Sequence, residues 1–382
     1  MSFRSGYDLS RIFFENSTCF HLHLPSCRVF QYGHVNQKEI AMDLSTKYLG
    51  LKLKNPIIVG SSGLTGTVKG VKKLADNGAA AIVLKSLFQE EIFFESDDVI
   101  RKMKKEHPDV QYFDYDGKKN PIEFYGYKVR EDNLKRYTTL IRDCKSGVHI
   151  PIIASVNCFY DSLEWVLFAR ELEQAGADAL ELNMFFPPTD FSANRQGKET
   201  IYFETIDKIS KEISIPISMK ISYYFTDLGP MIKALSETDI KGLVLFNRFF
   251  SPDFDIQKLE VKPSFVFSAP SELAQSLRWI AIMANKVSCD LAASTGIHDG
   301  EAVIKEILAG ADVVQVVSAL YIHGPGHIQS MLDDLKSWMK SHGFGSISDF
   351  KGKLSQEASK DPKLYERTQF MKYFAGKSNV IS

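Results

Sequence analysis

Two lysines end apolar segments of this sequence, and their type and position make them the first candidates for chemistry. Lys85 closes the segment AIVLKS, and Lys220 closes the segment ISMKIS. A single lysine at such a position usually extends its ammonium group from the rim of the core to water, and a lysine is almost never fully buried without a partner. Two asparagines, Asn157 and Asn183, end similar apolar segments. We therefore interpret the four residues as parts of one ligand site.

A glycine turn and a serine follow the last two apolar segments, and together they predict a phosphate site. The turn is Ser294-Thr295-Gly296 in ASTGIHDG, and Ser318 lies in VVSAL. Backbone N–H groups of a glycine turn, hydroxyl groups and a helix N-terminus bind phosphate well. A phosphate beside lysines fits a phosphorylated planar cofactor such as FMN, whose anionic reduced ring is stabilised by positive charge. The predicted cofactor-binding residues are Ser61, Ser62, Lys85, Ser86, Asn157, Asn183, Lys220, Ser294, Thr295, Gly296, Val317 and Ser318.

Eight apolar, strand-like segments precede these candidate residues. They begin near residues 56, 80, 151, 179, 216, 241, 290 and 312. Continuous apolar runs are typical of parallel strands buried on both faces, and glycine suits the left-handed cap of the helix that ends before three of them, at Gly78, Gly176 and Gly310. Eight alternating units predict an α/β fold, a (β/α)8 TIM barrel with its site at the C-terminal strand ends. A doubly wound sheet is the alternative, but it more often has about six strands, and no GxGxxG opens the first unit.

Three segments outside this repeat have their own predicted roles. STKYLGLKLKNP, ahead of the first strand, alternates like a short hairpin and is expected to plug the bottom of the barrel. Residues 86–130 and 247–269, after strands two and six, are longer than the about 12–15 residues of ordinary loops. The first insertion holds an aromatic group that either covers a planar ligand or packs against a partner subunit. The group consists of Tyr112, Phe113, Tyr115, Phe124, Tyr125 and Tyr127.

The charge balance excludes several classes of partner. The 382 residues include 46 Lys and Arg and 47 Asp and Glu, so the net charge is −1. We therefore expect a small planar substrate, and neither nucleic acid nor a membrane, because no apolar run reaches the roughly 18–20 residues of a membrane helix. The five scattered cysteines form no CxxC pair, which argues against a disulfide framework, a zinc ribbon and an iron–sulfur cluster. We expect no metal and a reducing, cytoplasmic setting.

The first 41 residues differ in pattern from the rest of the chain. They show neither helical periodicity nor strand alternation, and they lack the layout of a secretory signal. They are either an upstream extension, with Met42 as the functional start, or a loosely packed arm. We expect residues 1–41 to be a poorly ordered N-terminal extension, residues 42–355 to form the FMN-binding barrel, and residues 356–382 to be a C-terminal tail.

From Met42 to about Leu354 the chain resembles the dihydroorotate dehydrogenase family, especially its soluble branch. The resemblance rests on LSTKYLGLKLKNPIIVGSSG, AAIVLKS, LELNMFFPP, ISMKI, LFNR, ASTGIHDGEAVIKEILAGADVVQVVSAL and HGFGSISDFKGKL. It implies an FMN-binding barrel that oxidises dihydroorotate to orotate in pyrimidine biosynthesis, and we expect a homodimer. It also places seven residues beside the flavin or the substrate: Lys85, Asn183, Lys220, Asn247, Thr295, Gly296 and Ser318.

The substrate half of the site departs from the family pattern. The fourth strand of the soluble branch ends in Asn-Leu-Ser-Cys-Pro-Asn, whose cysteine removes a proton from the substrate carbon and whose last asparagine binds the substrate. This chain has Asn183-Met184-Phe185-Phe186-Pro187-Pro188 instead. Phe186 therefore stands at the position of the base, where the membrane-associated branch has serine, and phenylalanine accepts no proton. Pro188 removes the second polar side chain.

Two further positions of the substrate half also differ. After strand six the family has Asn-Ser, whereas this chain has Asn247-Arg248. An asparagine of the strand-two insertion aligns loosely with Glu123. We expect Asn183, Asn247 and Arg248 to bind the substrate, and Arg248 is suited to hold a carboxylate through two hydrogen bonds.

The missing base leaves three functions open. Losing a general base typically costs about 10²–10⁴ in rate. The protein is then a dihydroorotate dehydrogenase with an unconventional base, a flavin oxidoreductase for another planar substrate such as another dihydropyrimidine, or a non-catalytic FMN-binding protein. The catalytic residue stays unknown, and Cys158 and Ser222 are the candidate substitutes. Fumarate, a quinone, NAD through a partner subunit and oxygen all stay open as electron acceptors.

Overall fold

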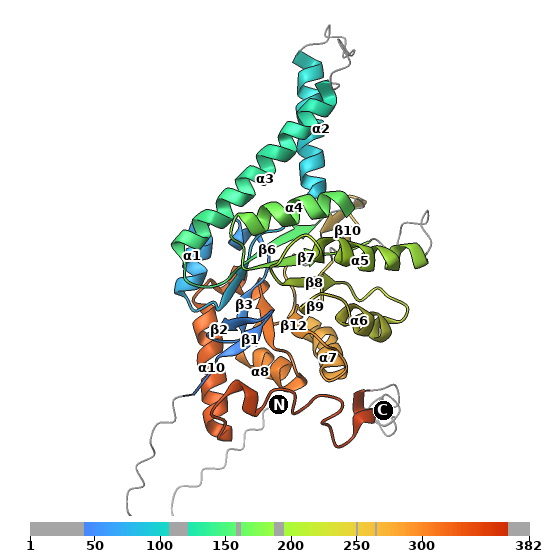
Figure 1. The fold of residues 1–382 in the computed structure, drawn as a ribbon. Coiled ribbons are helices and arrows are strands. Elements are labelled where there is room, and N and C mark those ends of the chain that lie inside the picture. The colour runs from blue at the N-terminus through green and yellow to red at the C-terminus, as the bar shows by residue number, and fades with distance from the viewer. Residues whose placement is uncertain are drawn as a thin grey trace, which may run out of the picture. The chain divides into compact units, whose positions relative to one another are not determined.

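The apolar segments form eight parallel strands that close into a barrel (Figure 1). The computed structural model describes residues 42–106, 121–157, 162–186, 195–249, 251–263 and 266–365. The barrel strands are β3 (Ile57–Val59), β4 (Ala81–Val83), β6 (Ile152–Asn157), β7 (Ala179–Asn183), β8 (Ile217–Ile221), β9 (Gly242–Leu245), β12 (Asp290–Ser294) and β13 (Val313–Val316). Pairing of β4 with β6 closes the ring. This confirms the predicted (β/α)8 barrel.

Helices alternate with these strands and surround the barrel (Figure 1). They are α1 (Val68–Asp76), α2 (Gln89–Glu106), α3 (Pro121–Gly147), α4 (Ser162–Gln174), α5 (Arg195–Ser210), α6 (Leu228–Ser236), α7 (Leu273–Met283), α8 (Gly300–Ala309), α9 (Ser318–His323) and α10 (His327–His342). Short 3-10 helices lie at Gly63–Thr65, Pro270–Glu272, Ile347–Asp349 and Pro362–Tyr365. The three predicted glycine caps all have positive φ, and a Cβ on Gly310 would lie 2.4 Å from the Cβ of Ala284.

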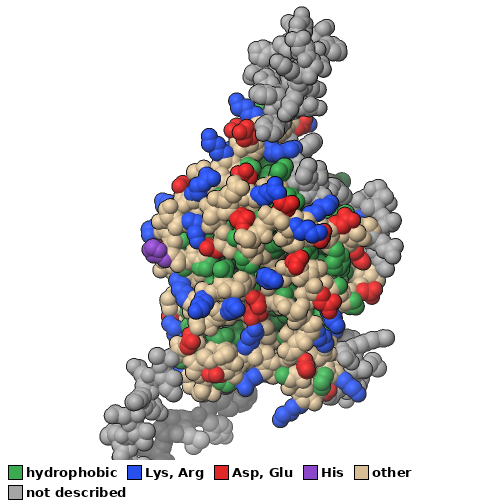
Figure 2. All heavy atoms as spheres, in the orientation of Figure 1, with side chains coloured by type: hydrophobic (Ala, Val, Ile, Leu, Met, Phe, Trp, Pro, Cys, Tyr) green, Lys and Arg blue, Asp and Glu red, His purple; other side chains and the backbone are tan. Residues whose placement is uncertain are grey.

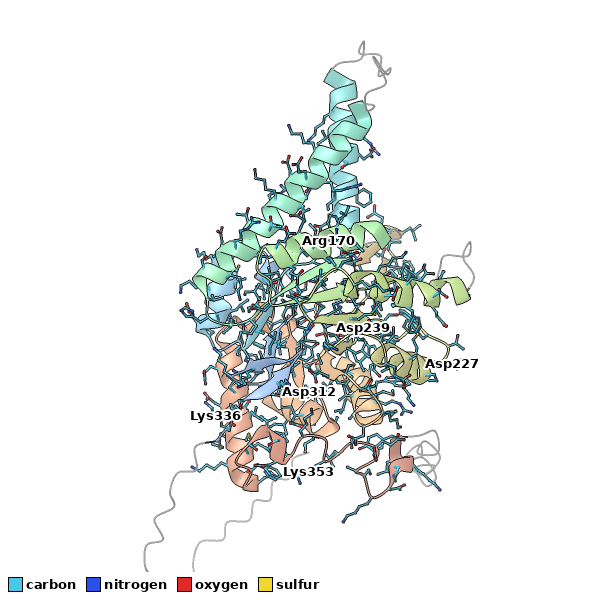
Figure 3. All side chains as sticks on the ribbon, viewed as in Figure 1. Arg170, Asp227, Asp239, Asp312, Lys336 and Lys353 are labelled. Carbon is cyan, nitrogen blue, oxygen red and sulfur yellow. The ribbon has the colours of Figure 1, made fainter. Side chains whose placement is uncertain are left out.

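A short hairpin plugs the N-terminal end of the barrel, as predicted. It consists of β1 (Thr46–Tyr48) and β2 (Leu51–Leu53), which pair antiparallel. Tyr48 and Leu49 are almost fully buried and pack so closely on β9 that a Cβ on Gly242 would lie 2.7 Å from Leu49. The Thr46 hydroxyl donates a hydrogen bond to the carbonyl of Asp312, which is labelled in Figure 3 (3.1 Å). The floor of the barrel is therefore closed.

The insertion after strand two is mostly helical. A two-residue strand, β5 (Leu87–Phe88), pairs with β6 beyond β4, and α2 and α3 follow it. Figure 1 shows the free ends of these two helices extending together away from the barrel. The predicted aromatic group is not tested, because Tyr112, Phe113 and Tyr115 lie outside the described residues. The side chains of Phe124, Tyr125 and Tyr127 in α3 also lie outside the described set.

The insertion after strand six is a second hairpin, made of β10 (Pro252–Asp255) and β11 (Glu260–Pro263). Several of its apolar side chains face solvent, and Leu259 is 90% exposed. After it the chain returns to the barrel through residues 266–269 and enters α7. This return segment matters for the site because it runs over the C-terminal strand ends.

The surface gives no sign of a strongly charged or membrane-spanning protein in the part of the chain that is described. On the face drawn in Figure 2, Lys and Arg side chains are interspersed with Asp and Glu side chains. Within the described ranges, no helix combines the length and the apolar character needed to cross a membrane. In the same ranges, no group of three or more His, Cys, Asp or Glu is placed to hold a metal ion.

Candidate active site

The interior of the barrel has an apolar lower layer and a polar upper layer. Side chains alternate across a strand, so residues two positions apart share a face. The lower layer includes Ile153, Ala179, Ala292 and Val313, which cluster with the plug hairpin. The residues two positions further along these strands are Ser155, Glu181, Ser294 and Gln315. The interior of a TIM barrel is usually filled with bulky apolar side chains. The polar layer therefore indicates that the functional site lies at this end of the barrel.

A pocket of about 240 Å³ opens at the C-terminal end of the barrel, beside this polar layer. Nine predicted cofactor or substrate residues line it, from β3, β8, β9, β12 and β13 or directly after them. They are Ser61, Lys220, Asn247, Arg248, Ser294, Thr295, Gly296, Val317 and Ser318. Val266, Ser268, Ile297 and Gln315 line it as well. The structure thus brings together residues that are up to 257 positions apart, from Ser61 to Ser318.

The turn after β12 contains the predicted glycine, Gly296, in a left-handed backbone conformation. Thr295 and Gly296 have φ values of +84° and +77°, a conformation that turns successive N–H groups to one side. A Cβ on Gly296 would lie 2.1 Å from the backbone nitrogen of Leu273, so α7 packs directly against this turn. The Thr295 hydroxyl donates to the carbonyl of Phe246 (3.3 Å). Only glycine fits at position 296.

The contribution of a helix N-terminus to phosphate binding at this pocket stays a prediction. The carboxylate of Asp299 caps α8 by accepting a hydrogen bond from the amide of Ala302 (2.8 Å). This acidic cap already occupies the positive end of the helix. The helix after β13 has only six residues, Ser318–His323, too few for an appreciable dipole. Hydroxyl groups and the turn backbone are therefore the donors that this wall of the pocket offers to an anion.

The return segment is tied to this wall. The amide of Ser268 donates to the hydroxyl of Ser318 (3.0 Å), and the Ser268 hydroxyl is hydrogen-bonded to Nε2 of His298 (3.0 Å). Burial lowers the pKa of His298, so the neutral imidazole is favoured. His327 Nε2 contacts the carbonyl of His298 at 2.7 Å. Because Ser268 connects the segment to both final strands, it shapes the pocket that it lines.

The two predicted lysines have different environments. Lys220 is 8% exposed and donates a hydrogen bond from Nζ to Oε1 of Gln315 (2.9 Å). Lys85 is half exposed and forms an ion pair with Glu91 at the start of α2 (3.0 Å). Lys85 does not line the pocket. Its place beside the flavin stays a prediction.

Other predicted cofactor residues form a hydrogen-bonded row next to the pocket. The Ser61 hydroxyl accepts from the amide of Ser86 (2.8 Å), and the Ser86 hydroxyl is 2.7 Å from that of Ser155. The phenol of Tyr137 in α3 donates to the carbonyl of Ser155 (3.1 Å). The hydroxyl of Ser62 is buried without a partner among the described residues. Asn157 ends β6 and, like Ser62 and Ser86, lies outside the pocket lining.

On the substrate side, the two asparagines meet and Phe186 is packed away. Asn247 donates to the side-chain oxygen of Asn183 (2.9 Å), which links the ends of β7 and β9. Phe186 is 9% exposed, and its ring contacts Tyr202 of α5 edge to face at a centroid distance of 5.2 Å. Phe186 is therefore part of the core behind the site. Pro188 and Cys158 lie outside the described residues.

Arg248 lines the pocket, but its guanidinium is bound by the protein itself. Nε forms an ion pair with Glu272 (3.1 Å), Nη1 donates to the carbonyl of Val266 (2.9 Å) and Nη2 to that of Phe267 (3.2 Å). The arginine thus clamps the return segment over the pocket. Its proposed role as a carboxylate ligand stays a prediction.

Aromatic rings gather at the ends of β7, β8 and β9. The rings of Phe185 and Phe249 lie 4.0 Å apart between centroids, and Tyr224 lies 5.2 Å from Phe249. Tyr223 contacts Tyr224 at 4.7 Å and the buried Phe246 at 5.8 Å. Tyr223 and Tyr224 are 38% and 48% exposed, so the cluster presents aromatic faces at the mouth of the barrel. We call these five residues the aromatic cluster.

The sequence analysis missed four residues of the pocket lining, Val266, Ser268, Ile297 and Gln315, and the buried Glu181 next to Gln315. Ser268 and Val266 could not be placed, because the fold of the 247–269 insertion was unknown. Gln315 and Glu181 carried a signal: each is a polar residue inside an otherwise apolar strand, at the inward-facing position.

The comparison with known proteins agrees with this geometry. A profile of the dihydroorotate dehydrogenase family matches residues 43–339. The chain belongs to this family. It is a dihydroorotate dehydrogenase-like protein.

Named relatives cover most of the chain. A chloroplastic dihydropyrimidine dehydrogenase (NADP(+)) of Arabidopsis thaliana is 27% identical over 351 residues, which are 85% of this chain and 80% of the relative. The catalytic subunit of dihydroorotate dehydrogenase B (NAD(+)) of Thermoplasma acidophilum is 27% identical over 314 residues, 81% of this chain and 98% of the relative. A putative dihydroorotate dehydrogenase A (fumarate) of Aeropyrum pernix is 24% identical over 316 residues, 81% of this chain and 97% of the relative.

Proposed function

We propose that the protein binds FMN in this pocket and oxidises a CH–CH bond of a planar dihydropyrimidine ring, with dihydroorotate as the first substrate to test. The observation that carries the proposal is the pocket itself, where Lys220 and several hydroxyl groups face one space at the strand ends. Relatives named for dihydroorotate and for dihydropyrimidines share this ring class as substrate. A membrane or a nucleic acid is no part of the proposal.

The residues of the pocket suit FMN. Serine and threonine hydroxyls and the turn at Gly296 would hold its phosphate, and Lys220 would place positive charge beside its ring. A Cβ on Gly60 would lie 2.9 Å from the side chain of Val317, so β3 and β13 pack closely at their C-terminal ends. When bound, FMN supplies a ring that accepts a hydride. The paired amides of Asn183 and Asn247 would hydrogen-bond to the amide groups of the substrate.

The proton that leaves the substrate has no obvious acceptor among the described residues at the family position. Phe186 is packed in the core and accepts none. Ser222 is buried, and its hydroxyl accepts a hydrogen bond from the amide of Tyr224 (3.2 Å), which is a structural role. Cys158 stays a candidate outside the described residues. We therefore expect dihydroorotate to be oxidised slowly.

A second candidate function is oxidation of another, uncharged planar substrate. Two observations favour it: the internal ion pair of Arg248 and the exposed rings of the aromatic cluster. A carboxylate such as dihydroorotate gains from an unpaired cation, whereas a neutral ring gains from aromatic faces and amide partners. A non-catalytic FMN-binding protein is the third outcome of the test.

The test begins with the purified protein. Identification of a yellow, non-covalently bound cofactor as FMN supports the first step, and colourless protein that does not quench added FMN fluorescence overturns it. Anaerobic stopped-flow mixing then follows the flavin absorbance with dihydroorotate, 5,6-dihydrouracil and 5,6-dihydrothymine. Bleaching by dihydroorotate supports the first candidate, bleaching by a neutral ring alone supports the second, and no bleaching leaves the non-catalytic protein.

We further propose a cytoplasmic homodimer in which residues 42–355 form the functional barrel. The exposed apolar side chains of the β10–β11 hairpin, Phe254, Ile256, Leu259 and Val261, support a second copy as the partner. The proposed boundary at residue 355 is not sharp, because Gln356 is mostly buried. Its backbone N–H donates a hydrogen bond to the carbonyl of Ala281 in α7 (2.8 Å). Light scattering of the wild type and of Phe254→Lys tests the dimer, which the charged variant should weaken.

A further inference from the structure

Three polar side chains form a connected column inside the barrel, below the pocket. Glu181 of β7, Gln315 of β13 and Lys220 of β8 are 1%, 2% and 8% exposed. Gln315 and Lys220 line the pocket, whereas Glu181 lies one step deeper. A carboxylate and an ammonium group so far from water cost free energy unless they are paired and hydrogen-bonded.

The hydrogen bonds of the column have a fixed direction. Lys220 Nζ donates to Oε1 of Gln315 (2.9 Å), and Nε2 of Gln315 donates to Oε2 of Glu181 (2.5 Å). This arrangement matches a protonated lysine at one end and an ionised glutamate at the other, with the amide between them. The second oxygen of Glu181 has no partner among the described residues.

Among the charged groups around the column, Glu181 is the one that affects the protonation of Lys220. Burial lowers the pKa of Lys220, and the carboxylate of Glu181 opposes this shift. Burial raises the pKa of Glu181, and Lys220 and Gln315 oppose that shift. The other titratable groups near Glu181 are the phenols of Tyr48 in the plug hairpin and Tyr137 in α3. Burial raises the pKa of both phenols, so both stay neutral.

A purely structural pair is a poor explanation of this column. Replacing a buried ion pair by apolar residues is often neutral or stabilising, so burial of both charges is weak evidence for stability. In addition, the column leaves one carboxylate oxygen unsatisfied. The ammonium group of Lys220 at its upper end lines the pocket, where its charge can act on a bound ligand.

We propose that Glu181 is a positioning residue that acts through Gln315 to keep Lys220 protonated and pointed into the pocket. The proposal rests on the proposed function only for its flavin readout. Through this column, an acidic group that cannot touch the ligand controls the charge that a bound ring or anion experiences. Removal of the carboxylate should therefore make the pocket lose its positive charge at a lower pH.

The first experiment measures the midpoint potential of bound FMN between pH 6 and 9 in the wild type and in Glu181→Gln. We expect the reduced flavin to be bound at least tenfold more weakly in the variant at pH 8, which corresponds to about 30 mV for a two-electron couple. The matched control is Glu306→Gln. Glu306 is a fully buried carboxylate of α8, outside the column, and its variant should follow the wild type.

The second experiment needs no flavin. Protein labelled with ¹⁵N at the lysine side chains is titrated by NMR, and the Lys220 signal is assigned with Lys220→Met. In Glu181→Gln the signal should titrate at least one pH unit lower than in the wild type. Colourless protein would defeat the proposed function, but it would leave this titration as the test of the column.

Two results would overturn the proposal. One is an unchanged Lys220 titration in Glu181→Gln. The other is a midpoint potential that rises at every pH, which would mean that Glu181 only adds negative charge to the pocket. If Glu181→Gln does not fold, Gln315→Met breaks the connection and keeps both ions, and it should lower the Lys220 titration by a smaller amount. An unchanged titration in that variant overturns the proposal as well.

Discussion

The two sides of the barrel mouth differ in chemistry. At the ends of β12 and β13, the pocket wall consists of hydroxyl groups, a left-handed turn at Gly296 and the return segment tied to Ser318. At the ends of β7, β8 and β9, the aromatic cluster dominates, and Phe186 is packed behind it. The first side is suited to an anion, and the second is suited to a planar apolar face.

This difference indicates which part of the family's chemistry the chain keeps. An anion can be bound by backbone and hydroxyl groups, whose placement depends on a few glycine conformations. Proton removal from a substrate carbon needs a specific acceptor within hydrogen-bond reach. The described residues offer donors for the first requirement, whereas Phe186, which we expect at the position of the family base, offers no acceptor. Arg248 and Lys85 are also paired within the protein, with Glu272 and Glu91.

The largest expected effect concerns the anion side, at Gly296. In Gly296→Ala the added Cβ would meet the backbone of Leu273, so α7 or the turn must move. We expect a loss of about 3 kcal/mol or more in the free energy of unfolding, and loss of bound FMN. Gly176→Ala is the matched control, because Gly176 also has positive φ but open space around its Cβ position. It should cost about 1 kcal/mol and keep the flavin. Equal losses in denaturant unfolding would mean that the contact with α7 is unimportant.

The next prediction concerns the substrate side, at Phe186. Phe186→Cys places a thiol, with an ordinary pKa near 8.5, at the position of the family base. A recovered base is worth about 10²–10⁴ in rate when it is well placed, so we expect at least a tenfold faster bleaching of the flavin by dihydroorotate. The gain should grow as the pH rises toward the thiol pKa, because the thiolate is the base.

Phe186→Ala is the control for this gain, since it opens the same space beside Tyr202 without a thiol. If alanine and cysteine accelerate the reaction equally, space rather than proton transfer limits the wild type. A wild-type rate of roughly 1–10³ per second would show that another group already takes the proton.

A smaller effect is expected at the clamp between the two sides. Glu272→Gln removes the charge that pairs with Arg248, whose Nη1 also donates to the carbonyl of Val266. An ion pair that is partly exposed is worth at most about 1 kcal/mol, so orotate should bind up to about fivefold more tightly. Fluorescence titration of the flavin with orotate measures this. Weaker binding in the variant would show that the clamp on the return segment matters more than a free guanidinium.

The smallest effect is expected far from both sides, at the N-terminus. Removal of residues 1–41 should change the melting temperature by less than about 2 °C and should keep the flavin content, since the regular pattern begins at Met42. Differential scanning calorimetry of the two proteins is the measurement. A drop of several degrees would mean that this segment packs on the barrel.

Strong local patterns made the architecture predictable. Proline-opened or glycine-preceded apolar runs located six of the eight strands, and the apolar runs KGLVLF and CDLAAST located the other two. The alternation in STKYLGLKLKNP located the plug. Two of the predicted lysines and asparagines, Lys220 and Asn247, line the pocket. The helix N-terminus expected at the pocket stays a prediction, since Asp299 caps α8 and α9 has six residues. The secondary structure of the two insertions could not be predicted either, because their residues show no clear helical or strand periodicity.

The sequence by itself determined the order of the elements and the family, because these depend on local periodicity and on residue identity along the chain. The absence of the usual base at Phe186 stays a prediction. Only the tertiary structure decided which charged side chains are paired within the protein. Arg248 and Glu272 are 24 positions apart, and Gln315 and Glu181 are 134 positions apart. A side chain's charge is set by the groups that surround it after folding, and those groups come from strands that are distant in the chain. The column of Glu181, Gln315 and Lys220 therefore exists only once the barrel has closed.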